Sequence, residues 1–401
     1  MKAISLYTGV GGLDFGFEAA GFHTAVALEL DPVACRTIKL NRDWEVLLGD
    51  IEDIKSGEIL DAAEVAVGEA SVLIGGPPCQ PFSKSGYWDN GDADRLKDPR
   101  ASTLREYLRV LEDTLPEVFL LENVHGLAYR GKDEGLRYLL DGVLRINKRK
   151  RTNYQVAYEK LNAASFGVPQ MRERVFLIAH RDGRHFSFPP PTHGPLNNDK
   201  SLQPFHTTWD AIGDLLPDPK DQSLEITGQW ADLLPSIPEG ENYLWHTSRG
   251  GGMTLFGWRS RYWSFLLKLA KSRPSWTIQA QPGPAIGPFH WKNRRLSAHE
   301  MCRIQTFPGE LRFDCKRGDV QRLIGNAVPS LLAEVLAREI RTQLLQKPAK
   351  GPLRLMPTRR SSTPPPEVPL PVVKKYHHLV ADYPEHPGEG KGPRAARRAS
   401  A

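Results

Sequence analysis

Short apolar segments alternate with helix-like segments over residues 1–182, and this alternation constrains the fold more than any other feature of the chain. The apolar segments have the length of buried strands, and some of the segments between them carry apolar residues at helical spacing. The expected strands are Ala3–Tyr7, Thr24–Glu29, Glu45–Leu48, Val72–Ile74, Val118–Glu122, Gln155–Leu161 and Arg174–Ala179, and the expected helices are Leu13–Ala20, Pro32–Leu40, Thr103–Leu115 and Leu136–Arg145. This pattern predicts an α/β fold with a doubly wound, mostly parallel sheet.

The composition and the residue pattern change after residue 182. From Phe186 to about Pro288 the chain is rich in Pro, Gly and Trp and shows no clear period, whereas regular patterning returns at Leu296–Phe307 and Pro329–Leu345. We therefore expect a first domain over residues 1–182, a second, irregular domain over 183–293, and a hinge helix with a return to the first domain over 294–345.

Residues 346–401 hold 11 of the 33 prolines, and their 11 Lys/Arg against 4 Asp/Glu give a net charge of +7. This composition predicts a disordered basic tail. The whole chain carries a net charge of +6, so the body is close to neutral. Any nucleic-acid surface on the body must then be a local basic patch.

A glycine-rich turn, Tyr7–Phe17, follows the first strand. Such a turn is where an open α/β sheet binds a nucleotide-like ligand, because glycine lets the backbone approach the ligand. Glu29 ends the second strand and Asp50-Ile51 follow the third, and acids there suit ribose hydroxyls and an adenine amino group. The three strand ends together predict an adenosine-bearing ligand. The alternative is that the turn is only tight and that both carboxylates cap helices.

The string Gly75–Ser83 places Cys79 on a stiff loop directly after a buried strand. A thiol in this position is a candidate nucleophile. Glu122 ends the next strand, where burial would raise its pKa and let it donate a proton. Arg172 and Arg174 lead into the last strand and could position the loop, a base or a phosphate. A structural cysteine, a helix-capping carboxylate and a solvated strand edge are the plainer alternatives.

These segments resemble, in order and over roughly residues 1–345, the motifs of the DNA (cytosine-5-)methyltransferases. The resemblance implies a Rossmann-like, S-adenosylmethionine-dependent methyltransferase fold in which Cys79 adds to C6 of a flipped cytosine, with Glu122, Arg172 and Arg174 beside the ring. The cofactor residues that it implies are Tyr7, Thr8, Gly9, Gly11, Gly12, Glu29, Asp50, Ile51, Pro78 and Asn326. The chain departs from the family pattern at Ser5, where an acid is usual, and at Tyr7, where Phe is usual.

Two further segments match the family. Arg294–Pro308 reads as a helix whose Ser297 and Glu300 suggest a capping box, and the resemblance gives it a structural role. Gly325–Pro329 opens the final helix, and the resemblance brings Asn326 near the methionine end of the cofactor.

The irregular block would read the DNA target, because interleaved Arg, aromatic and Gly residues suit groove contacts. The expected DNA-contacting residues are Gln80, Ser83, Arg249, Arg259 and Arg261. We expect a bacterial, cytoplasmic and nucleoid-associated monomer that acts on double-stranded DNA and has a restriction endonuclease as its functional, not necessarily physical, partner. We expect no metal site, since the four cysteines form no CxxC pair, and no membrane association. A solitary epigenetic methyltransferase, a tRNA methyltransferase and an inactive DNA-binding regulator remain as alternatives.

Overall fold

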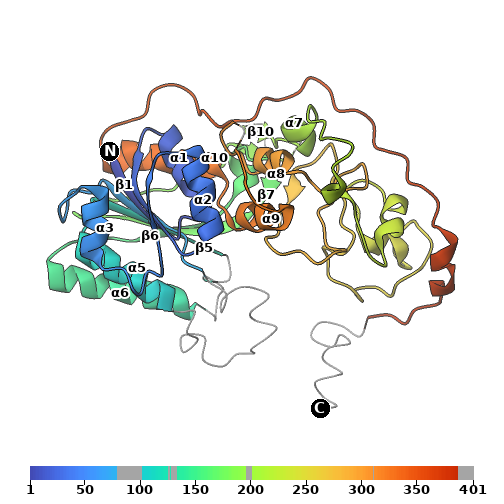
Figure 1. Ribbon diagram of the computed structural model, residues 1–401, viewed down its shortest axis with the longest axis horizontal. Coiled ribbons are helices and arrows are strands. Elements are labelled where there is room, and N and C mark those ends of the chain that lie inside the picture. The colour runs from blue at the N-terminus through green and yellow to red at the C-terminus, as the bar shows by residue number, and fades with distance from the viewer. Residues whose placement is uncertain (79–101, 125–126, 128–132, 196–200, 310, 387–401) are drawn as a thin grey trace, which may run out of the picture.

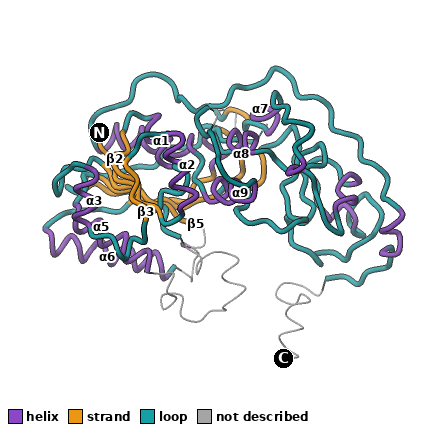
Figure 2. The backbone as a smooth tube through the Cα atoms, viewed as in Figure 1, coloured by secondary structure: helices purple, strands orange, loops and turns teal. Residues whose placement is uncertain are grey.

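The computed structural model describes residues 1–78, 102–124, 127, 133–195, 201–309 and 311–386. Its centre is a seven-stranded sheet of order β3-β2-β1-β4-β5-β8-β6 (Figures 1 and 2). The strands are β1 (Lys2–Leu6), β2 (His23–Glu29), β3 (Glu45–Leu48), β4 (Val72–Gly75), β5 (Val118–Val124), β6 (Ala157–Asn162) and β8 (Glu173–His180). Strands β1 to β5 pair in parallel, and β8 pairs antiparallel to both β5 and β6.

Helices cover both faces of this sheet (Figure 1). Helices α3 (Ser56–Ala63), α5 (Ser102–Thr114) and α6 (Glu134–Lys150) bury their apolar residues against one face. Helices α1 (Gly12–Ala19) and α10 (Ser330–Glu339) do so on the other face, and α2 (Pro32–Asn41) packs beside β2 and β3. The doubly wound α/β class predicted from the alternation is confirmed.

The strand order reverses between β1 and β4, because β2 and β3 lie on one side of β1 while β5 lies beyond β4. In open α/β sheets, ligands bind at the carboxyl ends of the strands beside such a switch point. The topology therefore predicts a ligand site at the carboxyl ends of β1 and β4.

The block after β8 has little regular structure. Its elements are β9 (His193–Gly194), β10 (Gln203–Pro204), α7 (Thr208–Ile212), the 3-10 turns Gln222–Leu224, Ala231–Ser236 and Tyr243–His246, and β11 (Ser275–Trp276). It nevertheless has its own core, built from Leu233, Leu234, Ile237, Tyr243, Leu255, Phe256, Phe265, Leu266 and Phe289. Helices α8 (Ala298–Ile304) and α9 (Arg317–Asn326) then lead back to α10 and the sheet. The capping box predicted at the start of α8 is present.

The structure differs from the expected disordered tail over residues 347–386. This segment runs from the end of α10 along the molecule to the irregular block, where it forms the 3-10 turn Lys374–Leu379 (Figure 1). Tyr376 is buried in the core of that block and stacks on Trp230, with ring centroids 5.8 Å apart. Prolines keep such a segment extended at little entropic cost, so proline-rich composition is compatible with an ordered path as well as with disorder.

Candidate active site

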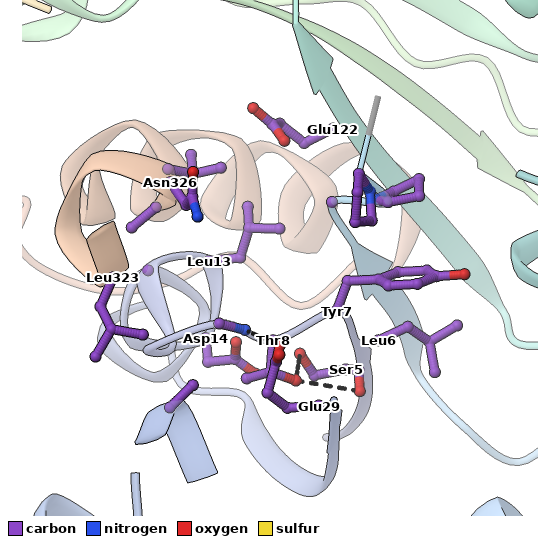
Figure 3. Close-up of a pocket in the computed structure, with 18 of the residues that line it drawn as sticks. Ser5, Leu6, Tyr7, Thr8, Leu13, Asp14, Glu29, Glu122, Leu323 and Asn326 are labelled. Atoms are coloured by element: carbon purple, nitrogen blue, oxygen red, sulfur yellow. Dashed lines mark hydrogen bonds between the residues drawn. The ribbon is translucent and has the colours of Figure 1, made fainter. Parts of the chain in front are cut away.

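A cavity of about 430 Å³ opens at the carboxyl ends of β1, β2, β4 and β5 (Figure 3). It lies where the strand order reverses, as expected for a nucleotide-like ligand. The predicted residues that line it are Tyr7, Thr8, Gly9, Gly12, Glu29, Pro78, Glu122, Arg174 and Asn326. Segments far apart in the chain thus meet around one space.

The glycine-rich turn forms one wall of the cavity. Gly9 has φ +58°, and a Cβ built there would meet nothing within 4 Å, so its open side faces free space. Gly11 has φ +87° and caps α1, and a side chain there would press on the ring of Trp44. The two glycines therefore have different functions: Gly9 leaves room in the cavity, whereas Gly11 shapes the helix start and does not line the cavity.

Glu29 ties this turn to the end of β2. Its carboxylate accepts hydrogen bonds from the backbone N–H of Gly9 at 2.7 Å and of Asp31 at 2.8 Å. Burial raises the pKa of Glu29, while these two hydrogen bonds oppose that rise. The carboxylate is consequently a fixed acceptor at the cavity wall, with a position set by the backbone around it.

Tyr7 stands at the end of β1 with φ +55°. Its hydroxyl donates to the backbone carbonyl of Thr103 in α5 at 2.7 Å, and burial raises the pKa of the phenol, so the ring is neutral. The hydroxyl that distinguishes Tyr from the usual Phe thus has a partner, and it fixes the ring at the cavity wall.

Ser5, the other departure from the family pattern, also lines the cavity and accepts a hydrogen bond from the Thr8 hydroxyl at 3.0 Å. The fully buried carboxyl of Asp14 lies close to it, accepting from Thr24 Oγ1 at 3.0 Å. Burial raises the pKa of Asp14 to about 6. The turn is therefore braced by hydroxyls and by an acid from α1.

Asp50 and Ile51 stand apart from the cavity lining. Asp50 is exposed and accepts a hydrogen bond from the backbone N–H of Glu52, while Ile51 is buried in the sheet core. The charge of Asp50 nevertheless helps to raise the pKa of Tyr7, so it acts near the Tyr7 ring.

The other end of the cavity holds an ion pair. Glu122 Oε1 lies 2.8 Å from Arg174 Nε, and both side chains are largely buried. Burial raises the pKa of Glu122, and the positive charge of Arg174 opposes this effect. A Cβ on Gly76 would lie only 2.9 Å from Glu122 Oε2, so a side chain there would displace either this carboxyl or the start of the cysteine loop.

The start of the cysteine loop is held against Glu122 by two hydrogen bonds. Asn123 Nδ2 donates to the carbonyl of Pro77 at 3.2 Å, and Thr103 Oγ1 donates to the carbonyl of Pro78 at 3.1 Å. Cys79, Gln80 and Ser83, which follow directly, lie outside the described residues.

Arg172 has a different position from Arg174. Its fully buried guanidinium donates to the carbonyl of Gly325 at 2.8 Å and to that of Ile278 at 3.3 Å, and it does not line the cavity. This arginine, directly before β8, is hydrogen-bonded to α9 and to the end of the irregular block. Its position suits a residue that holds these parts together.

The C-terminal return completes the cavity with Asn326 at the end of α9. Gly12 makes this closure possible, since a Cβ there would lie 2.4 Å from the carbonyl oxygen of Val328. Asp31 and Arg322, which no sequence motif singles out, form an ion pair at the cavity wall. Asp31 directly precedes Pro32, which is a typical N-cap position, but no sequence pattern links it to an arginine 291 positions later.

The three arginines expected to contact DNA are exposed. Arg249 stacks over the ring of Trp258 at 4.5 Å, and Arg259 lies 5.9 Å from the same ring. Arg261 lies 5.7 Å from the Phe265 ring, at the edge of the second core. Such stacking on aromatic rings orients guanidinium groups at the surface.

Comparison with known proteins identifies the class to which this fold and cavity correspond. Residues 1–342 match the family model described as C-5 cytosine-specific DNA methylase. The chain belongs to this family and is a DNA (cytosine-5-)-methyltransferase.

Two relatives of the chain are likewise named as methyltransferases. The chain is 40% identical to the Type II methyltransferase M.SacI of Streptomyces achromogenes over 88% of this chain and 95% of that protein. It is 46% identical to the Type II methyltransferase M.AquIA of a Picosynechococcus strain over 54% of this chain and 89% of that protein. A mutant of Spodoptera frugiperda DNMT2 shares the fold, with a TM-score of 0.58 and 17% identity over 84% of this chain and 99% of that one.

None of the helices in the described ranges has the combination of length and apolar character that crossing a membrane requires.

Proposed function

We propose that this enzyme transfers a methyl group from S-adenosyl-L-methionine to C5 of a flipped cytosine at a specific sequence in duplex DNA. The observation that carries the proposal is that one cavity contains both a nucleotide-type wall, with Tyr7, Gly9 and Glu29, and the buried Glu122–Arg174 pair. Methyl transfer requires the methyl donor and the target base to lie in contact, and a single cavity allows this.

The residues present fit S-adenosylmethionine. A cavity of about 430 Å³ is in the range for a small ligand. We assign the ribose to Glu29, the adenine to the Tyr7 ring, and the methionine end to Gly9, Gly12 and Asn326. When bound, this compound supplies an electrophilic methyl group on a sulfonium.

The protein's task is to make a poor carbon nucleophile reactive. Addition of the Cys79 thiolate at C6 of cytosine forms an S–C bond and moves electron density to C5. C5 would then take the methyl group as the sulfonium–methyl bond breaks, which leaves the donor as a neutral thioether. Loss of the C5 proton and of the thiolate restores the aromatic ring.

Glu122 serves the same step in our proposal. Its raised pKa favours the protonated carboxyl, which donates a hydrogen bond to cytosine N3 as the ring accepts the thiolate. Arg174 orients that carboxyl through the 2.8 Å contact. Arg172 acts indirectly, by holding the segment that carries Arg174.

We further propose that the irregular block over residues 183–293 reads the DNA sequence through Arg249, Arg259 and Arg261. Gln80 and Ser83, on the cysteine loop, are proposed to contact the DNA as well. Because the relatives are Type II methyltransferases, we propose that the enzyme protects DNA from a partner restriction endonuclease, acting as a cytoplasmic monomer.

Bisulfite sequencing tests the proposal. DNA from a methylation-free host that expresses this chain is compared with DNA from a host that expresses Cys79→Ala. We expect protected cytosines in one short motif, absent in the variant, while Cys79→Ala protein still binds duplexes with that motif. Soluble wild-type protein that protects no cytosine would contradict the proposal and favour an RNA substrate or an inactive regulator.

A further inference from the structure

One side-chain hydrogen bond joins the two ends of the segment that carries Cys79. Thr103, in the first turn of α5, donates from Oγ1 to the carbonyl of Pro78 at 3.1 Å, and the two residues are 25 positions apart in the chain. Cys79 follows Pro78 directly, so the Cα atoms of these two residues lie about 3.8 Å apart. A contact that fixes Pro78 therefore also limits where the Cys79 thiol is placed.

Tyr7 holds Thr103 from the side of the cavity. The Tyr7 hydroxyl donates to the backbone carbonyl of Thr103 at 2.7 Å, and Tyr7 itself lines the cavity. Figure 3 shows this hydroxyl pointing away from Glu29 and Asn326, so the bond to Thr103 leaves the ligand space open. A phenylalanine, which is usual at this position in the family, has no such donor. In this chain the wall of the nucleotide-type site and the start of the cysteine loop are thus connected through one residue.

The hydroxyl of Tyr7 acts at the end of α5 that is most in need of a partner. The middle of this helix is anchored by Arg109, whose guanidinium donates to the carbonyls of Ile51 at 2.7 Å and Ile54 at 3.0 Å. The first turn of a helix frays more easily, because its N–H groups have no partners within the helix. Removal of the Tyr7 hydroxyl should therefore loosen the turn that carries Thr103 and leave the rest of α5 in place.

We propose that Tyr7 and Thr103 are positioning residues for the Cys79 thiol, an inference that rests on the proposed function. The Tyr7 hydroxyl fixes the first turn of α5, and the Thr103 hydroxyl fixes the carbonyl of Pro78, so that the thiolate meets C6 of cytosine in a productive position. Neither hydroxyl exchanges a proton or an electron in this step. Each hydrogen bond contributes only about 1 kcal/mol to stability, whereas misplacement of a reacting group by about an ångström costs about 100-fold in rate.

The test compares the rate of S–C bond formation with the affinities for both substrates. The probe is a duplex that carries the motif found by bisulfite sequencing, with 5-fluorocytosine as the target base. Fluorine at C5 cannot leave as a proton, so the enzyme stays attached to the methylated base through Cys79. At saturating S-adenosylmethionine and duplex, we expect Tyr7→Phe and Thr103→Val each to slow formation of this covalent complex about 10- to 100-fold. Calorimetric titration should give wild-type affinities for S-adenosylmethionine and for the unmodified duplex.

Two further variants examine whether the hydroxyls act in series. If the Tyr7 hydroxyl acts through Thr103, the double variant Tyr7→Phe/Thr103→Val should be no slower than the slower single variant, whereas independent effects would multiply. Thr103→Ser keeps the donor to the Pro78 carbonyl and should restore most of the wild-type rate. A rate for Thr103→Ser as low as that of Thr103→Val would contradict a role for this hydrogen bond.

Tyr154→Phe is the matched control for Tyr7→Phe. The buried Tyr154 hydroxyl also donates to a backbone carbonyl, that of Pro116 at 2.6 Å, but neither residue lines the cavity. This variant should form the covalent complex at the wild-type rate. Wild-type rates in both Tyr7→Phe and Thr103→Val would overturn the positioning role, as would slower rates accompanied by equal losses of affinity. In either case a wild-type protein that protects its motif leaves the proposed function standing, whereas absence of that protection would overturn the proposed function itself.

Discussion

At the scale of single residues, Gly76 sets how closely the cysteine loop approaches Glu122. A Cβ at this position would lie 2.9 Å from Glu122 Oε2, closer than real contacts allow. We expect Gly76→Ala to displace either the loop or the carboxyl and to slow methylation by about 10- to 100-fold, because misplacement by about an ångström is costly in catalysis. Single-turnover methylation rates measure this effect.

Gly57→Ala is the control for Gly76→Ala. Gly57 lies in α3, where an added Cβ meets nothing within 4 Å, so this variant should methylate at the wild-type rate. A Gly76→Ala enzyme as fast as Gly57→Ala would show that Glu122 tolerates the extra carbon.

Asp14 gives stability a specific pH dependence. Burial raises its pKa from 3.8 to about 6, so the folded protein holds this proton more tightly than the unfolded chain. The associated stability is fully present below pH 3.8 and is lost as the pH rises through 6. Asp14→Asn, which stays neutral and can still accept from Thr24, should therefore gain about 2 kcal/mol relative to wild type between pH 4 and pH 7.

Urea unfolding at several pH values compares the two proteins. Taking the difference between them cancels the groups that titrate in both. A difference in unfolding free energy that stays constant from pH 4 to pH 7 would contradict the expected ionisation of Asp14.

The sequence could identify those site residues whose position follows from the order of the strands. Glu29 and Glu122 end parallel strands, and such ends converge at one edge of a sheet. Arg172 and Arg174 were predicted to act on one side, but only Arg174 reaches the cavity, while Arg172 binds backbone carbonyls from two distant segments. Contacts of that kind depend on tertiary packing, which local patterns do not encode.

At the scale of elements, the close packing of α1 on α10 supports the cofactor wall. A Cβ on Gly16 would lie 2.4 Å from both the Ala333 Cβ and the Ser330 carbonyl oxygen. We expect Gly16→Ala to push the helices apart, at a cost of about 1–3 kcal/mol in unfolding free energy, and to weaken cofactor binding, because α1 begins at the cavity. Chemical denaturation and calorimetric titration measure the two effects.

Gly318→Ala in α9 has open space around its Cβ and is the matched variant for Gly16→Ala. It should keep wild-type stability and cofactor affinity. Equal stability of the two variants would mean that α10 adjusts freely, so that the close packing carries no energetic weight.

Elements were predictable where burial imposes a regular pattern. The expected strands of residues 1–182 all occur, with ends shifted by no more than two residues. Helix α6 extends beyond its apolar stretch to Lys150, because three basic residues favour a helix C-terminus. Helices α3, α7 and α9 were not among the expected helices, and the glycine in the first turn of α3 and of α9 lowers local helix propensity.

At the scale of the whole molecule, the segment over residues 347–386 connects the helices of the sheet domain with the irregular block. Glu334 in α10 accepts hydrogen bonds from the backbone N–H groups of Arg354 and Leu355. Further along, Glu367 lies 3.1 Å from the buried Nζ of Lys271, and Tyr376 completes the second core. The composition of this segment predicted only charge and disorder, because a few anchoring contacts spaced along a proline-rich chain leave no periodic signal.

These contacts change what truncation after residue 346 should do. If the segment contributed only positive charge, its loss would weaken DNA binding in a salt-dependent way and leave the fold intact. The structure instead predicts loss of a core side chain, since Tyr376 is only 3% exposed, and burial of such a ring contributes about 3 kcal/mol. We therefore expect the truncated protein to unfold at lower temperature and to lose specific DNA binding while it retains cofactor affinity.

Two point variants separate charge from packing in the full-length chain. Tyr376→Ala keeps every charge of the segment, and it should reproduce most of the loss in melting temperature and in specific DNA binding. Lys374→Ala removes one charge from an exposed position in the same turn and should behave as wild type at physiological salt. The opposite pattern, in which Lys374→Ala weakens binding and Tyr376→Ala does not, would show that the segment acts on DNA through its charge, with no part in the core of the irregular block.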